Sequence, residues 1–272
     1  MGEIEMKDLM GFEGKEVVVV GAATGMGDAA TRQLVELGAE VHALDVAEIT
    51  SPVKQSIEID LRDPASIDAA IEKLPAQIDS LFHCAGLPGA PWSALDTMLV
   101  NFIGQRHFTE AVVPRISKGG AIAIITSVAG IGWQKNREMV DALVATPDFA
   151  SGKAWCEANP EAANGYMFSK QCLIAYTKMR AAALVEDEVR INCLSPAPTD
   201  TPMLSAFHDQ VSKEFLEENF LAPIGRNATP AEMGDPLIFL NSHAARFISG
   251  ENLVVDYGYV ASTEVGQRPS FL

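Results

Sequence analysis

Short apolar runs rich in β-branched residues alternate with longer amphipathic segments along the whole chain. We expect strands near residues 16–20, 40–45, 56–60, 80–85, 121–126, 190–194 and 252–256, with helices between most of them. Strands that alternate with helices build a parallel sheet, and right-handed crossovers place helices on both of its faces. No repeat, low-complexity tract or linker divides the 272 residues. The pattern therefore predicts a single α/β domain over residues 1–272, with a Rossmann-type, doubly wound parallel sheet of about seven strands.

The first expected strand runs directly into a glycine-rich turn that contains Gly21, Gly25 and Gly27. Glycines allow a tight turn and a close approach of the backbone to a pyrophosphate, and the helix that follows offers unpaired N–H groups at its positive end. The spacing differs from the commoner Gly-x-Gly-x-x-Gly, and a turn that only joins strand to helix is the alternative. We expect this turn, with Thr24 and Met26, to hold the phosphates of a dinucleotide.

The second expected strand ends in Asp45, about 20 residues after Gly25, the distance at which a carboxylate reaches the ribose hydroxyls of a bound dinucleotide. A carboxylate accepts a hydrogen bond from the 2′-hydroxyl and repels a 2′-phosphate. Neither Thr24 in the turn nor the adjacent Val46 supplies a cation that would bind such a phosphate. Asp45 therefore favours NAD over NADP, the alternative being a solvated acid at a strand end.

Tyr166 and Lys170 are four residues apart on an expected helix, so their side chains share one face. A nearby ammonium favours the phenolate and is expected to lower the pKa of Tyr166 towards the working pH, where the phenol can act as general acid and base. Ser127 closes a buried strand upstream and can donate to the oxygen on which charge changes. Tyr-x-x-x-Lys alone is a common accident on helices, but here it follows an expected dinucleotide turn.

Taken in order, these motifs resemble those of the short-chain dehydrogenase/reductase family over residues 13–258. The resemblance implies a catalytic tetrad of Asn101, Ser127, Tyr166 and Lys170, in which the asparagine orients a water beside the lysine. It also implies a set of coenzyme-binding positions spread over the chain. These positions are Gly21, Thr24, Gly25, Met26, Gly27, Asp45, Asp60, Leu61, Cys84, Ala85, Gly86, Tyr166, Lys170, Pro196, Thr199 and Thr201.

Two motifs depart from the family pattern. The family's Asn-Asn-Ala-Gly is replaced by a segment that begins with His83 and Cys84, which we expect to be structural substitutes rather than new catalytic groups. The family's Pro-Gly-x-Val-x-Thr segment, which clamps the nicotinamide carboxamide, has alanine in place of glycine after Pro196 and Thr199 in place of valine. Thr201 is still expected to reach the coenzyme.

The stretch between Ser127 and Tyr166 is longer than in most of the family, which predicts an insertion at about residues 131–165 beside the active site. Such an insertion resembles the branch that contains 3α-hydroxysteroid dehydrogenase/carbonyl reductases and coniferyl-alcohol dehydrogenases. Its aromatic residues either wall a pocket for a flat apolar substrate or belong to the local core. Its cations either bind an anionic tail or are solvated. The aromatic residues are Trp133, Phe149 and Trp155, and the cations are Lys135, Arg137 and Lys153.

Residues 202–222 combine apolar and charged residues in an amphipathic pattern after the sixth expected strand. We interpret this segment as a lid over the cleft, the alternative being an ordinary packed surface helix.

Composition excludes several other classes. The net charge of −16 argues against nucleic acid and anionic membranes as partners, since both need a cationic face. The four cysteines lack metal-ligand spacing, so no metal is predicted, and they suit a reducing compartment. Residues 1–7 lack the pattern of a signal peptide, and we expect a cytoplasmic protein. The family resemblance implies a homodimer or homotetramer.

The sequence thus predicts an NAD-dependent oxidoreductase that interconverts an apolar cyclic or aromatic alcohol and its carbonyl compound. A 3α-hydroxysteroid is the leading substrate, followed by a coniferyl-type aromatic alcohol and then by a 3-oxoacyl group. A non-catalytic sensor of NAD(H) is the alternative from a different class.

Overall fold

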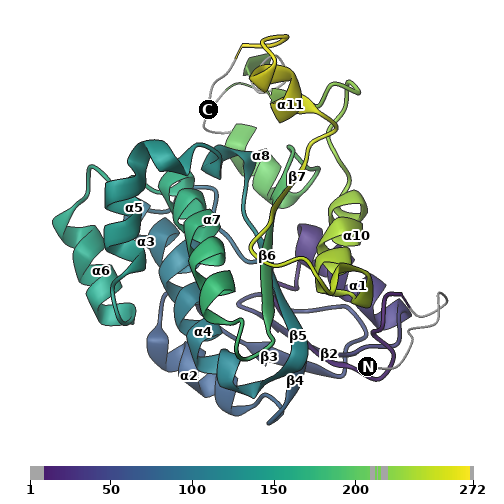
Figure 1. Cartoon of the computed structure of the whole chain (residues 1–272). Helices are drawn as coiled ribbons and strands as arrows, with labels where there is room; N and C mark the ends of the chain where they lie inside the picture. Colours follow the sequence, from purple (N-terminus) through teal and green to yellow (C-terminus); the bar gives the residue numbers. More distant parts are fainter. Residues whose placement is uncertain (1–8, 209–211, 213, 216–219, 270–272) are drawn as a thin grey trace.

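The structure, a computed structural model, describes residues 9–208, 212, 214–215 and 220–269. Seven strands, paired in parallel, form one sheet in the order β3-β2-β1-β4-β5-β6-β7 (Figure 1). The strands are β1 (Glu16–Val20), β2 (Glu40–Asp45), β3 (Gln55–Glu58), β4 (Ile78–His83), β5 (Ile116–Ile125), β6 (Arg190–Pro196) and β7 (Asn252–Val255). The order reverses between β1 and β4, where a parallel sheet opens a ligand crevice. The predicted doubly wound Rossmann-type fold is confirmed.

Alternate residues of β1 pack on opposite faces of the sheet. Val17 and Val19 belong to a core beneath α1 (Gly25–Glu36) and α10 (Pro230–Asn241). Val18 and Val20 belong to the core on the other face, which α2, α4 and α7 cover (Figure 1). These helices are α2 (Pro64–Glu72), α4 (Gln105–Val112) and α7 (Tyr166–Ala183). Since all four valines are fully buried, both faces of the strand stabilise the fold, as expected for a continuous apolar run.

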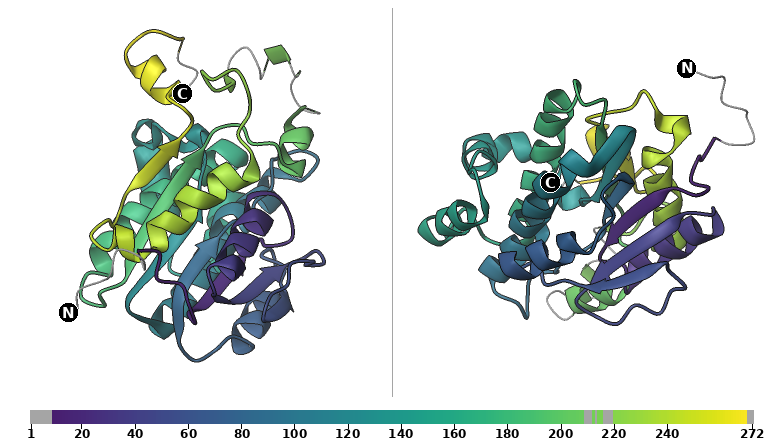
Figure 2. Two further views of the ribbon diagram at one scale, coloured as in Figure 1. Left: turned by 90° about the vertical axis from the view of Figure 1, so that its right-hand side faces the viewer. Right: turned by 90° about the horizontal axis from the view of Figure 1, so that it is seen from below.

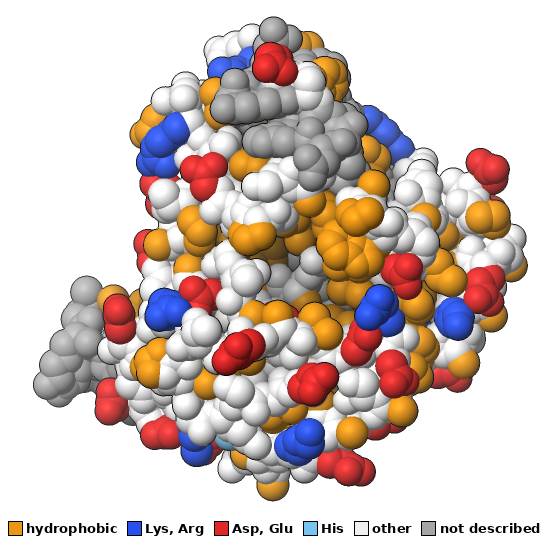
Figure 3. Space-filling model, turned by 180° about the vertical axis from the view of Figure 1, so that it is seen from behind, with side chains coloured by type: hydrophobic (Ala, Val, Ile, Leu, Met, Phe, Trp, Pro, Cys, Tyr) orange, Lys and Arg blue, Asp and Glu red, His pale blue; other side chains and the backbone are white. Residues whose placement is uncertain are grey.

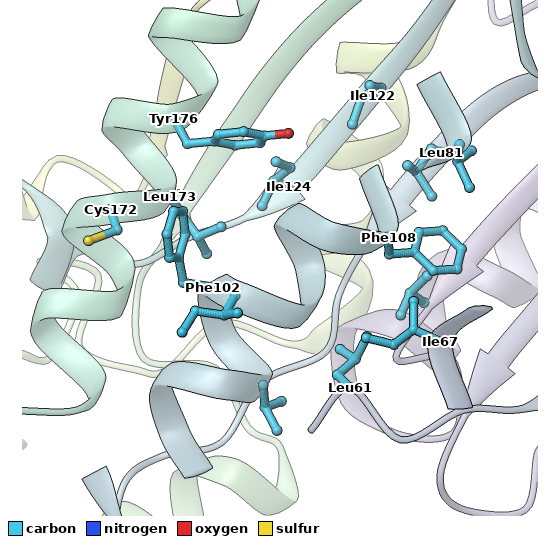
Figure 4. Close-up of a cluster of buried hydrophobic side chains, with 14 of the residues drawn as sticks. Leu61, Ile67, Leu81, Phe102, Phe108, Ile122, Ile124, Cys172, Leu173 and Tyr176 are labelled. Carbon is cyan, nitrogen blue, oxygen red and sulfur yellow. The ribbon is translucent and has the colours of Figure 1, made fainter. Parts of the chain in front are cut away.

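Large side chains fill the core under α7. Phe102 and Tyr176 meet edge to face with ring centroids 6.1 Å apart, and both lie close to Ile124 of the sheet (Figure 4). Full burial of each such side chain stabilises the folded state by about 1.5–3 kcal/mol. This core holds α7, the helix that contains Tyr166 and Lys170, against β5.

The insertion forms an extra layer outside α7. It contains a short 3-10 turn (Trp133–Asn136), α5 (Arg137–Val144) and α6 (Phe149–Ala158), which lie on the side of α7 away from the sheet (Figures 1 and 2). Val140 and Leu143 of α5 are fully buried in the same core as α7. The expected insertion at about 131–165 is therefore an ordered, packed part of the domain.

The buried guanidinium of Arg106 anchors this layer. It donates to the carbonyl oxygens of Leu143, Val144, Thr146 and Asp148 over 2.8–3.3 Å, and to the hydroxyl of Thr146 at 2.8 Å. Burial lowers the pKa of Arg106, so these acceptors must compensate for lost hydration.

The remaining elements are short helices and turns between the strands and near the C-terminus. They are α3 (Ala94–Met98), a π-helix (Leu99–Gly104), three 3-10 turns (Val113–Arg115, Val128–Gly130 and His243–Ala245), α8 (Pro202–His208) and α11 (Tyr259–Glu264). β5 begins earlier than expected because Ile116 pairs with Ile78 across a register shift in the sheet. Among the described residues, none of the helices combines the length and apolar character that a membrane span needs.

Candidate active site

The glycine turn after β1 is tightly packed against the end of β4. Gly21 and Gly25 have left-handed φ angles of 85° and 60°, which favour glycine. A side chain on Gly21 would meet the backbone of Ala85, and one on Gly27 would meet the carbonyl oxygen of Gly21. Only glycine therefore fits at position 21, where the turn contacts the segment after β4, and at position 27, where the first turn of α1 contacts the glycine turn.

Helix α1 begins at Gly25, and its N-cap residue Thr24 makes no side-chain capping bond. The first N–H groups of the helix remain available for an anion, and the helix dipole favours negative charge at this end. Because the tight glycine turn leads directly into this helix end, the geometry fits the pyrophosphate of a dinucleotide.

Asp45 ends β2 beside the same turn. Its carboxylate accepts hydrogen bonds from the backbone N–H groups of Ala23 at 2.9 Å and Ala47 at 3.0 Å. The side chain thus also holds the glycine turn in place, a structural role that the sequence analysis did not identify.

Asp60 and Leu61 follow β3 at the same edge of the sheet. The guanidinium of Arg62 lies 2.7 Å from the Asp60 carboxylate and holds its pKa below the usual range. Arg62 was not predicted as a site residue, although its position two residues after Asp60, next to Leu61, was a usable signal.

Tyr166 begins α7, and Ser127 follows β5, so the sheet and the helix bring the two hydroxyl groups together. Burial raises the pKa of Tyr166, while hydrogen bonding with the Ser127 side chain lowers it, and the net direction is upward. The expected lowering of the pKa of Tyr166 by the ammonium is therefore wrong. Removal of the phenol from water outweighs the stabilisation of its charged form.

Lys170 is buried, with 2% of its surface exposed, and its Nζ donates to the carbonyl oxygen of Ile125 at 3.1 Å. The same nitrogen lies 5.6 Å from the centre of the Tyr166 ring. Burial lowers the pKa of Lys170 to about 8. Removal of the ammonium from water thus outweighs its favourable interactions within the protein.

Asn101 lies in the π-helix, fully buried behind the crevice. Its Oδ1 accepts from the N–H of Leu87 at 2.6 Å, and its Nδ2 donates to the Leu87 carbonyl at 3.0 Å and to Ser169 Oγ at 3.1 Å. Asn101 therefore ties the loop after β4 to α7, through a helical irregularity of a kind that is frequent at functional sites.

In the segment that replaces Asn-Asn-Ala-Gly, His83 lies in the core, whereas residues 84–86 line the crevice. His83 is fully buried, its Nε2 is 2.8 Å from Thr109 Oγ1, and burial lowers its pKa to about 3. Burial raises the pKa of the Cys84 thiol to about 12. A neutral imidazole and a protonated thiol fit the expected structural role of both residues.

These elements line a single cleft of about 300 Å³ at the carboxyl edge of the sheet. In the view from behind, hydrophobic side chains gather around a hollow in the surface (Figure 3). Most predicted coenzyme positions line the cleft: Gly21, Thr24, Gly25, Met26, Asp45, Asp60, Leu61, Cys84, Ala85, Gly86, Tyr166, Lys170, Pro196 and Thr201.

Four predicted residues are not among those that line the cleft: the catalytic candidates Asn101 and Ser127, and the coenzyme positions Gly27 and Thr199. Gly27 packs under the turn, and Thr199 is buried with its hydroxyl donating to the Ala197 carbonyl at 2.9 Å. Conversely, several lining residues were not predicted from the sequence. Among them are Arg62, Leu87, Trp92, Val100 and Thr126.

The aromatic residues of the insertion belong to the core and do not line the cleft. Trp155 stacks on Phe168 with centroids 6.1 Å apart, Phe149 is buried, and Trp133 packs against the same core. Of the cations, Arg137 pairs with Asp141 at 3.1 Å and Lys153 with Glu157 at 4.0 Å, each within its own helix. Of the two interpretations, the one that assigns these aromatic residues to the local core is confirmed.

The expected lid is described only in part, because residues 209–211, 213 and 216–219 lie outside the described residues. Its first helix, α8, brings Met203 into the cleft lining. Phe207 meets the ring of Tyr166 edge to face, with centroids 5.0 Å apart. α8 therefore packs directly on the candidate catalytic residue.

Within the described part of the chain, no group of three or more His, Cys, Asp or Glu side chains has the arrangement of a metal site.

Comparisons with known proteins agree with this geometry. Residues 15–139 match the protein family described as short chain dehydrogenase, and residues 154–260 match the family described as enoyl-(acyl carrier protein) reductase. The chain is 33% identical to coniferyl-alcohol dehydrogenase from Pseudomonas sp. (strain HR199 / DSM 7063), covering 94% of this chain and 100% of that protein.

It is also 32% identical to 3-alpha-hydroxysteroid dehydrogenase/carbonyl reductase from Comamonas testosteroni, covering 89% of this chain and 95% of that protein. The fold resembles the crystal structure of 3-alpha-hydroxysteroid dehydrogenase from Pseudomonas sp. B-0831 complexed with NADH. That comparison has a TM-score of 0.77 at 24% identity and covers 92% of this chain and 99% of that chain.

Proposed function

Since this chain belongs to the short-chain dehydrogenase family, we propose that it is an NAD-dependent oxidoreductase that interconverts an apolar cyclic or aromatic alcohol and its carbonyl compound. The observation that carries the proposal is that Tyr166 and Lys170 line the same cleft as the glycine turn. A proton-transfer group and a dinucleotide cradle in one cleft are what hydride transfer to or from a carbonyl carbon requires.

Each residue has a defined task in the proposed reaction. When bound, the nicotinamide ring supplies the hydride acceptor or donor. Tyr166 holds or takes the hydroxyl proton of the substrate, and the Ser127 hydroxyl donates to the substrate oxygen as negative charge develops there. The Lys170 ammonium, which lies over the face of the Tyr166 ring, stabilises the phenolate when it forms.

The preference for NAD is supported by the acid at the end of β2. Asp45 lines the cleft next to the glycine turn, where its negative charge disfavours a 2′-phosphate. Arg62, a cation that lines the same cleft, is paired with Asp60 at 2.7 Å.

Two substrate classes stand out. A 3α-hydroxysteroid is the candidate from the sequence pattern, and the 32% identical relative supports it. A coniferyl-type aromatic alcohol is supported by the 33% identical relative, which the chain covers along its full length. Both are apolar alcohols, and the lining near Tyr166, which includes Leu87, Trp92 and Met203, suits an apolar ring.

The test is to incubate the purified protein with NAD or NADP and a panel of alcohols, and to follow the absorbance of the reduced coenzyme. The panel contains a 3α-hydroxysteroid, coniferyl alcohol, cyclohexanol and 2-butanol. We expect turnover of a ring-containing alcohol with NAD. Tight NAD binding without turnover of any alcohol would favour a sensor of NAD(H) instead.

We further propose that the protein is a cytoplasmic homodimer or homotetramer, as many members of the family are. Light scattering after gel filtration measures the subunit number directly, and a monomer at micromolar concentration would contradict the proposal.

A further inference from the structure

Trp92 is an exposed aromatic residue on the rim of the active-site cleft. It retains 40% of its surface exposed and lines the cleft together with Tyr166 and Met203. Trp133 and Trp155, by contrast, pack against the core beneath the insertion. An exposed indole in a concave site costs hydrophobic free energy in the unbound protein, which ligand contact would recover.

The backbone around Trp92 is held firmly. The N–H of Trp92 donates to the carbonyl oxygen of Gly89 at 3.0 Å, and the next residue, Ser93, caps α3 by accepting from the N–H of Asp96 at 2.9 Å. Earlier in the same loop, Leu87 is held by two hydrogen bonds to Asn101. The indole is therefore presented from a fixed frame, as a preorganised binding surface requires.

The loop backbone around Trp92 lies against the start of α7. A side chain on Gly165, the residue before Tyr166, would lie 3.7 Å from the Cα of Ala94, two residues after Trp92. The loop that presents the indole and the N-terminus of α7 are thus neighbours, at the end of the cleft where the phenol lies.

The other side of this end is formed by α8. A side chain on Gly86 would lie 3.4 Å from the Cε of Met203, and Phe207 packs edge to face on Tyr166 at 5.0 Å. Among the described residues that line the cleft, the charged ones are Asp45, Asp60, Arg62 and Lys170. The first three lie at the carboxyl ends of β2 and β3, and Arg62 also interacts electrostatically with Asp96 of α3. Apart from Arg62 and the catalytic pair, the lining side chains of this part of the cleft, such as Leu87 and Met203, are apolar.

We propose that Trp92 is a specificity-determining residue, whose indole stacks on the planar ring of an aryl alcohol and sets the preference of this enzyme for aromatic over aliphatic alcohols. This inference rests on the proposed dehydrogenase function and deepens it. An indole supplies a large flat surface, and offset stacking of aromatic rings adds to the free energy of burial. A thioether at Met203 on the opposite side adapts to a ring of varied substitution.

The experiment compares Trp92→Ala and Trp92→Phe with the unmodified enzyme. We expect Trp92→Ala to lower kcat/KM for coniferyl alcohol about tenfold or more, while kcat/KM for 2-butanol changes by less than about twofold. Trp92→Phe keeps an aromatic ring and should recover most of the loss. Phe247→Ala truncates an aromatic side chain that is fully exposed on the surface and serves as the matched control, with no expected change for either alcohol.

Binding provides a readout that does not depend on turnover. Calorimetry measures the dissociation constant of coniferyl alcohol for the unreactive complex of enzyme and NADH, and we expect it to rise about tenfold in Trp92→Ala. The dissociation constant of NADH itself should stay the same. Equal losses for both alcohols, or weaker NADH binding, would show that the indole contacts the coenzyme or supports the fold and would overturn the inference.

The two proposals fail in different ways. Turnover of alcohols with an unchanged preference in Trp92→Ala overturns the role of Trp92 and leaves the dehydrogenase function intact. Absence of turnover in the unmodified enzyme overturns the dehydrogenase function. Absence of aryl alcohol binding to its NADH complex overturns the role of Trp92 whatever the turnover.

Discussion

The ammonium nitrogen of Lys170 lies 5.6 Å from the centre of the Tyr166 ring and donates its hydrogen bond to a backbone carbonyl, that of Ile125. Burial disfavours the charged form of both side chains, so the pKa of Tyr166 rises and the pKa of Lys170 falls to about 8. At neutral pH the pair therefore consists of a neutral phenol and an ammonium. As the pH rises, the first proton to leave comes from the lysine.

Replacing Lys170 by methionine should change how stability depends on pH. The folded-state pKa of about 8 lies below the ordinary lysine value of 10.5, so the unfolded chain binds more protons between these values. The stability contribution of Lys170 is thus present above about pH 10.5 and is lost as the pH falls through about 8. At pH 7 the cost of burying the charge is about 3 kcal/mol, on the scale of 1.36 kcal/mol per pKa unit.

Chemical unfolding of both proteins between pH 7 and 10 measures this effect. Lys170→Met should be more stable than the unmodified protein at pH 7, and the difference should shrink as the pH rises. A difference that stays constant over this range would contradict the lowered pKa.

Tyr166→Phe should lower kcat by about 10² to 10⁴ because the general acid and base is lost. The affinity for NADH, measured by the fluorescence of the bound coenzyme, should change little. Tyr176→Phe is a suitable control, since Tyr176 is buried in the core and its hydroxyl donates to Glu110 at 2.7 Å, outside the cleft lining. Activity that survives in Tyr166→Phe would rule out the assigned role.

Asp45→Asn should reduce the preference for NAD over NADP about tenfold, because the charge that repels a 2′-phosphate is removed while one acceptor for the N–H of Ala23 or Ala47 is kept. The measurement is the ratio of kcat/KM for the two coenzymes. Glu36→Gln, at the exposed C-terminal end of α1 and outside the cleft lining, controls for the loss of one negative charge. An unchanged ratio in Asp45→Asn would count against a ribose contact.

Arg106→Met should destabilise the protein by about 3 kcal/mol, because the backbone acceptors around the buried guanidinium lose a charged donor. Hydrogen exchange should rise at residues 143–148, where these acceptors lie. Arg137→Met removes an exposed pair with Asp141 and should cost no more than about 0.5 kcal/mol. Similar effects of both substitutions would mean that Arg106 does not anchor the insertion.

Local patterns in the sequence were sufficient for much of the fold and of the coenzyme half of the cleft. The run Val17–Val20 is buried on both faces of the sheet. Of the glycines that follow, Gly21 and Gly25 have left-handed φ angles, and Gly21 and Gly27 approach other backbone atoms closely. Asp45 lies at the strand end where the pattern placed it. These features depend on neighbours in the chain, which is why periodicity and turn chemistry predict them.

The substrate half depends on contacts between distant segments. The choice between pocket and core for Trp155 required knowledge of its stacking on Phe168, and Trp92 lies in an irregular loop without any periodic signal. The pKa direction of Tyr166 was also missed, because the spacing of Tyr166 and Lys170 shows that the two are near each other but not how far both are removed from water. Burial is a property of the assembled fold.

The glycine turn, Asp45 and Asp60 come from the first three strand ends of the chain, whereas Trp92 and α8 belong to two later segments of the cleft lining. We therefore expect random substitutions confined to residues 87–93 and 202–207 to change which alcohols the protein accepts, while the glycine turn stays intact. Such a division makes the protein a modular starting point for directed evolution, and it offers natural selection the same freedom to diversify substrates within one ancestral scaffold.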